Sequence, residues 1–247
     1  MYSATLFGAT PGDLMKKLSA LLVTSAIVAL SACDSDDDNS VAAVSEPGTF
    51  QVTFTNMTAG QLMTPPVVAL HDPSAHLFQV GSTASDAIRD IAETGNNAAL
   101  VAFAGENPDL VSAATVVGTG PFGAGANVTG SLTTTESGQV FSAVNMVICT
   151  NDGISGVDSI ALPAGNEPVT VMAMAYDAGT RVNQADALSF FPPPCAAGDA
   201  VNEAPVEDPR AEIAAHAGQG GLANVAEGAN WDFAAGDQVL QIEIVRN

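Results

Sequence analysis

The sequence predicts an all-β protein, an antiparallel β-sandwich with one or two short helices. Short runs with apolar residues at alternate positions recur along the chain, as in half-buried strands. Glycine-rich turns separate many of these runs, and two segments have the spacing of a helix. Short strands that follow one another in a single domain are typical of a sandwich.

The first predicted strand is "FQVTFTN", where Phe50, Val52 and Phe54 alternate with polar residues. The last is "QVLQIEIVR" at 238–246, which alternates in the same way. Five further runs complete the predicted sandwich: "VVALH" (67–71), "NVTGSLT" (127–133), "QVFSAVNMVIC" (139–149), "VDSIAL" (157–162) and "PVTVMAMAY" (168–176).

Two segments depart from the strand pattern and predict short helices. In "ASDAIRDIAETG", Ile88 and Ile91 follow helical spacing, and Gly95 stands where a C-terminal cap belongs. The second predicted helix is "DPRAEIAAHAG", with Asp208 as its N-cap, proline at its first position and Gly218 as its stop. We expect both helices to lie on the outside of the sandwich.

The N-terminal region predicts export and a lipid anchor. A basic head at Lys16 and Lys17, an apolar stretch and the small residues before Cys33 have the order of a secretory signal over residues 1–32. The segment "LSAC" resembles the lipobox of bacterial lipoproteins, in which the cysteine is acylated. An ordinary secretory signal with a chance cysteine is the alternative, and Met15 is the expected true start.

The expected mature protein has a tether followed by one domain. Residues 33–48 contain the lipidated cysteine and an acidic stretch with little to bury, so we expect a disordered spacer. Residues 49–247 form the predicted sandwich. Anchoring would place the protein in the bacterial cell envelope, facing the periplasm or the cell exterior.

The charge of the mature chain excludes one class of partner. Without residues 1–32 the chain keeps four arginines, no lysine and 26 of its 27 acidic residues, a net charge of −22. Such a surface repels nucleic acid phosphates and attracts metal cations. The alternative for most of these acids is that they only keep the protein soluble.

Two cysteines remain after lipidation of Cys33, in a compartment that permits disulfides. We expect Cys149 and Cys195 to pair. In the chain-entropy model, a disulfide that closes a loop of about 45 residues stabilises the fold by roughly 3–4 kcal/mol. Two buried free thiols are the alternative.

The sequence contains few parts of an enzyme. It has no lysine in the mature chain, no G-x-S-x-G elbow, no glycine-rich phosphate loop and no H-E-x-x-H pair. His71 and His76 in "HDPSAH" suit neither one strand face nor one helix face as metal ligands, and His216 gives no further signal. Ser155 and Ser159 lie near glycines with no indicated base. We therefore expect a non-enzyme, and a secreted hydrolase or metalloenzyme is the alternative.

Three aspartates stand where predicted strands meet loops. Asp152 lies in a turn, Asp158 opens one predicted strand and Asp177 closes the next. If these strands pair as antiparallel neighbours, the three carboxylates converge at one edge and repel each other unless a cation binds. Calcium accepts such irregular oxygen sites. The alternative is that each aspartate caps a turn.

The motifs "DGISGVDSI" and "YDAGT" resemble the paired motifs of the spondin domain, the N-terminal module of F-spondin and mindin. The likeness extends to "FTNMTAGQLMTPPVVALHD" and the closing "NWDFAAGDQVLQIEIVRN", so it covers roughly residues 48–247. The resemblance implies a calcium-binding β-sandwich of extracellular adhesion, with Asp152, Asp158 and Asp177 as the calcium ligands. Gly153 and Arg181 depart from the animal modules, which have an aromatic residue and an acid at these positions.

These observations predict a lipid-anchored, calcium-binding module for adhesion or recognition at the bacterial envelope. Its partners would be the membrane, through the lipid, and an unidentified envelope or extracellular ligand. The animal partners do not transfer, because the adhesive role rests on the fold-level likeness alone.

Overall fold

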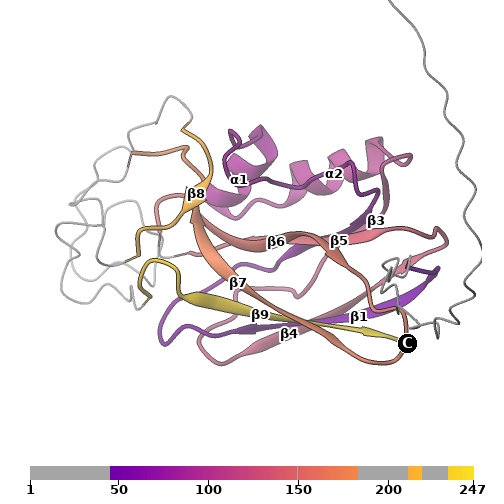
Figure 1. Ribbon diagram of the computed structural model, residues 1–247. Helices are drawn as coiled ribbons and strands as arrows, with labels where there is room; N and C mark the ends of the chain where they lie inside the picture. Colours follow the sequence, from indigo (N-terminus) through magenta and orange to yellow (C-terminus); the bar gives the residue numbers. More distant parts are fainter. Residues whose placement is uncertain (1–44, 149, 183–210, 219–232) are drawn as a thin grey trace, which may run out of the picture. The chain divides into compact units, whose positions relative to one another are not determined.

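The computed structural model describes residues 45–148, 150–182, 211–218 and 233–247 (Figure 1). In this part of the chain every strand pairing is antiparallel, and the all-β prediction is confirmed. The strands are β1 (Gly48–Asn56), β2 (Val67–His71), β3 (Val111–Val116), β4 (Asn127–Thr134), β5 (Val140–Met146), β6 (Gly153–Ala161), β7 (Val169–Asp177), β8 (Ala214–Ala215) and β9 (Gln238–Arg246). The helices are α1 (Asp86–Thr94) and α2 (Ala98–Glu106).

The strands follow one path of neighbours, β3-β2-β5-β6-β7-β9-β1-β4, with β8 beside β7. Strand β7 belongs to both halves of this path. Its first part pairs with β9 as far as Met174, and its last three residues, 175–177, pair with β6. The register shifts between Ala173 and Met174, where the strand passes from one half to the other.

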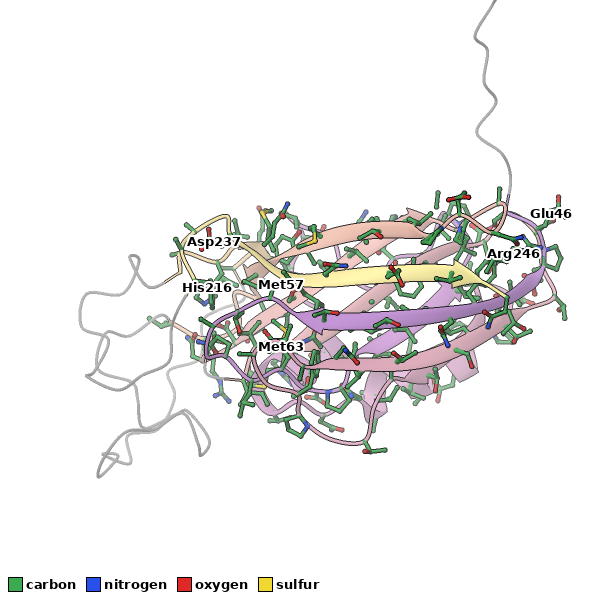
Figure 2. The ribbon with its side chains drawn as sticks, turned by 90° about the horizontal axis from the view of Figure 1, so that it is seen from below. Glu46, Met57, Met63, His216, Asp237 and Arg246 are labelled. Atoms are coloured by element: carbon green, nitrogen blue, oxygen red, sulfur yellow. The ribbon has the colours of Figure 1, made fainter. Side chains whose placement is uncertain are left out.

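The two halves of the path make two layers, and the helices add a third. We call β9, β1 and β4 the outer sheet, and β3, β2, β5 and β6 the helix-side sheet. Figure 1 shows α1 and α2 over the face of the helix-side sheet that points away from the outer sheet. Figure 2 views the outer sheet, with His216 and Asp237 at one end and Glu46 and Arg246 at the other.

Each face of the helix-side sheet packs on its own hydrophobic core. Strand β2 lies between both cores and is buried along its whole length. Val67 and Ala69 pack with α1 residues such as Ile88 and Ile91, while Val68 and Leu70 pack toward the outer sheet. This double burial explains why "VVALH" is a continuous apolar run.

Helix α1 forms where the sequence predicts it. Ser85 is its N-cap and accepts a hydrogen bond from the Ile88 N–H, and Gly95 ends it with φ +69°. A Cβ at Gly95 would also lie 2.7 Å from Thr64 Cγ2, so both the backbone angle and the packing require glycine.

The second predicted helix is wrong in the part that the structure describes. Residues 211–218 contain strand β8, which pairs with the end of β7, and no helix. Ile213 exchanges backbone hydrogen bonds with the loop before α1, at 2.8 Å to Gly81 and 2.9 Å to Ser82. The backbone N–H and C=O groups of this segment therefore form hydrogen bonds with residues distant in sequence, and not with one another as in a helix. Asp208 lies outside the described residues.

Helix α2 and strand β3 have no counterpart in the prediction. Leu100 and Ala104 are buried on α2, whereas Phe103 is 43% exposed. The helix is apolar on most sides and so shows no helical period. Within the described residues, no helix is both long and apolar enough to cross a membrane.

Candidate functional site

The register of two strands brings Asp152 and Asp177 together. Strand β6 begins at Gly153, which pairs with Asp177 at the end of β7. Asp152, one residue before β6, therefore lies beside Asp177, and its carbonyl accepts a hydrogen bond from the Ala178 N–H at 3.2 Å. Two of the three predicted calcium aspartates thus meet at one end of the sandwich.

The Asp152 side chain is completely buried. Its Oδ2 accepts hydrogen bonds from the Thr180 N–H (2.8 Å), the Thr180 hydroxyl (3.2 Å) and the Arg181 N–H (2.9 Å). Among the described residues, its Oδ1 has no hydrogen-bond partner. Burial raises the pKa of the Asp152 carboxyl to about 6, and the charge of Asp177 adds to the increase, whereas the hydrogen bonds from Arg181 and Thr180 oppose it.

Asp177 stands between this carboxyl and a buried histidine. Its Oδ1 accepts a hydrogen bond from the Gly179 N–H at 2.8 Å, which caps the turn after β7. Burial lowers the pKa of the His216 imidazole, and the Asp177 carboxylate opposes this decrease. His216 has no predicted role in the sequence, because the sequence predicts a helix where strand β8 pairs with β7 and brings His216 near Asp177.

Asp158 does not join the other two aspartates, which corrects the expectation of three converging carboxylates. It does not open a strand, because β6 begins five residues earlier at Gly153. Its carboxylate contacts His76 Nδ1 (2.5 Å), the Leu77 N–H (3.3 Å) and the Ser142 hydroxyl (3.0 Å).

Two glycines explain why the start of β6 is hard to predict. A Cβ at Gly156 would lie 2.0 Å from the Ala143 carbonyl oxygen of the neighbouring strand, and one at Gly153 would lie 2.3 Å from Thr150 Oγ1. Glycine is poor at forming strands, so these residues have the pattern of a turn. Here they allow a close approach of the neighbouring chain.

Ser155 and Ser159, the two serines that lie near glycines, are not placed as the nucleophile of a serine hydrolase. Ser155 Oγ is buried and donates to the Met174 carbonyl at 2.9 Å. Ser159 Oγ lies 3.4 Å from His76 Nδ1, the same nitrogen that faces Asp158. In a Ser-His-Asp triad the histidine uses one nitrogen for each partner, so this arrangement does not activate Ser159.

His71 contacts neither Asp152 nor Asp177, and the Ser142 hydroxyl lies between its ring and Asp158. Its Nδ1 lies 2.9 Å from the Asp72 carbonyl oxygen. Its Nε2 contacts the Ser142 hydroxyl at 2.7 Å, and the ring is buried. Among the described residues, no group of three or more histidine, cysteine, aspartate or glutamate side chains could hold a metal ion. Cys33, Cys149 and Cys195 lie outside the described residues, so the lipid anchor and the disulfide stay predictions.

A family model described as Spondin_N matches residues 49–197. The chain belongs to the Spondin_N family. The match contains β1 to β7 and both motifs quoted above, whereas β9, which lies between β7 and β1, falls outside it. Membership identifies a spondin N-terminal-type domain, a kind of module that suggests extracellular recognition or adhesion. No curated protein matches the chain.

The resemblance to spondin domains implies calcium, and two of the three expected ligands fit it. Asp152 and Asn151, in the same turn, each have a buried side-chain oxygen that no described residue contacts by a hydrogen bond. Carboxylate and amide oxygens beside a second carboxylate, Asp177, are a donor set that calcium accepts. Asp158 does not fit, because four protein groups already contact its carboxylate: the His76 ring, the Leu77 N–H and the hydroxyls of Ser142 and Ser159. The Arg181 guanidinium turns to Glu93, at 2.8 Å.

Proposed function

We propose that this protein is a calcium-binding recognition or adhesion module displayed on a bacterial cell envelope. The supporting observation is a spondin-type sandwich whose buried Asp152 carboxyl lies beside Asp177 and has one oxygen without a hydrogen-bond partner in the described part of the chain. A lipid on Cys33 would hold the domain at the membrane, and residues 33–48 would separate the two.

Asp152 and Asp177 are the residues proposed to hold calcium. Bound calcium would supply positive charge beside Asp152, whose proton affinity is raised by its burial and by the charge of Asp177. The loop at Thr180 and Arg181 fixes the orientation of the Asp152 carboxyl, because the N–H groups of both residues donate hydrogen bonds to its Oδ2. The free oxygen Oδ1 then has a fixed position, so little conformational entropy is lost on binding.

Two measurements test the proposal. Cell fractionation of a Cys33→Ser variant should move the protein from the membrane to the soluble fraction, because the lipid supplies the membrane affinity. Purified protein without the lipid should bind isolated envelopes in calcium and lose this binding in a chelator. An Asp152→Asn variant should bind weakly in both conditions. Binding that is equal with calcium, with chelator and in the variant would refute the calcium-dependent function.

A further inference from the structure

The His76 side chain is held by Asp158 in a fixed orientation. Because Asp158 Oδ2 accepts from Nδ1 at 2.5 Å, the proton of a neutral ring lies on Nδ1 and Nε2 has the free lone pair. Nε2 has no hydrogen-bond partner within the described part of the chain. The side chain is 33% exposed, so this nitrogen is available to a ligand.

A bulge in β6 directs the Asp158 carboxylate toward His76. Ser142 of β5 stands opposite two residues, Asp158 and Ser159, where the register between the strands shifts. Ser159 adopts φ +57°, and its N–H donates to the Ser142 hydroxyl at 2.8 Å. A non-glycine residue in this conformation is strained, and such strain and bulges gather at functional sites.

His76 lines a cavity of about 190 Å³, which we call the His76 cavity. Its apolar walls come from the buried side chains of Leu77, Phe78, Ile88 and Ile213. The backbone hydrogen bonds of Ile213 join the loop before α1 to the segment before β8. The cavity is therefore built before any ligand arrives, and its volume suits one ring rather than a drug-sized molecule.

The rim of the His76 cavity is polar, and the described residues that line it include no arginine or lysine. It includes the side chains of Gln79, Ser82, Thr83 and Ser85. Ser85 Oγ accepts from the Ile88 N–H, so its hydroxyl hydrogen is free to donate. Without a fixed cation, and on a chain of net charge −21, the rim does not favour an anion.

We infer that the His76 cavity binds one neutral polyhydroxylated ring, a single sugar residue. A ring hydroxyl donates to His76 Nε2, other hydroxyls exchange hydrogen bonds with the rim serines and threonine, and the apolar ring face packs on Leu77 and Phe78. Asp158 is a positioning residue that keeps the lone pair on Nε2. This goes beyond the proposed function, because the cavity shares no residue with the Asp152–Asp177 pair and needs no calcium.

The test is an NMR titration of the full mature chain, with the imidazole resonances of its three histidines observed. The probes are the methyl glycosides of glucose, mannose, galactose and N-acetylglucosamine. At least one should shift the His76 resonances saturably and leave those of the internal controls His71 and His216 in place. The titration should give the same result in calcium and in chelator, so that it is independent of the proposed calcium site.

Variants separate ligand contact from a structural role. His76→Gln and Asp158→Asn should each weaken the binding by about threefold to tenfold, the value of one hydrogen bond. Asp72→Asn, in the same loop, should leave it unchanged. An unaltered backbone spectrum shows that each variant is folded. The inference is overturned if none of the four glycosides shifts His76 saturably, if acetate or phosphate does so instead, or if the folded His76→Gln variant binds as wild type.

Discussion

Arg181 and Glu93 form an ion pair of 2.8 Å that joins the loop after β7 to the last turn of α1. The two side chains are 14% and 10% exposed. Arg181 also donates its backbone N–H to Asp152. Arg181 thus connects the candidate calcium site to the helical layer: its backbone N–H contacts Asp152, and its side chain contacts Glu93 of α1.

Breaking this ion pair should destabilise the domain strongly. Arg181→Ala or Glu93→Ala leaves a buried charge without its partner, which costs about 3–5 kcal/mol of unfolding free energy. Urea unfolding measures this loss. The exposed pair of Arg89 and Asp86, at 3.7 Å, is the matched control, and Asp86→Asn should change stability by less than about 1 kcal/mol. Equal effects at the two pairs would contradict the assignment.

The Asp152 carboxyl should make the calcium-free domain less stable as the pH rises. Its folded pKa is about 6 and its unfolded pKa is 3.8, so between these values the folded state binds more protons than the unfolded state. The free energy of unfolding should fall by on the order of 3 kcal/mol from pH 4 to above pH 6. The comparison is Asp152→Asn, since the difference between the two pH profiles isolates Asp152 from His216.

Calcium should raise the melting temperature through Asp152 and Asp177. At about 100 times its Kd, calcium adds roughly 2.7 kcal/mol, a shift of roughly 5–10 °C for a domain of this size. Asp152→Asn and Asp177→Asn should lose most of this shift in calorimetric scans. Asp158→Asn and the exposed control Asp109→Asn should keep it. A shift that disappears in Asp158→Asn as well as in Asp152→Asn and Asp177→Asn would restore the ligand set expected from the sequence.

The close approach of β5 to Gly156 should make this glycine irreplaceable. In Gly156→Ala the new methyl group would meet the Ala143 carbonyl at 2.0 Å, so the two strands must separate. We expect a loss of about 3 kcal/mol or more in denaturant unfolding. Gly165→Ala is the control, because nothing lies within 4 Å of its Cβ position and its stability should be nearly unchanged. A tolerated Gly156→Ala would show that the strands are less tightly packed.

Most strands could be predicted from apolar runs and from the alternation of apolar and polar residues. Strands β2 and β9 begin and end at the predicted residues, and helix α1 ends at the predicted C-cap Gly95. Elements whose sequence lacks a helical or strand period were missed or wrongly bounded. Helix α2 is apolar on most sides, and β6 begins among glycines, of which Gly156 packs against Ala143 of the neighbouring strand.

The sequence by itself determined the strand-rich fold, the spondin motifs and the likeness to calcium-binding modules, because these depend on residue types at short spacing. Only the tertiary structure decided which carboxylates share a site. The register of β6 and β7 brings Asp152 to Asp177, whereas a bulge in β6 directs Asp158 to His76. Register and bulges arise from strand pairing across the sheet, and a difference of a few residues in where β6 begins moves an aspartate from one site to another.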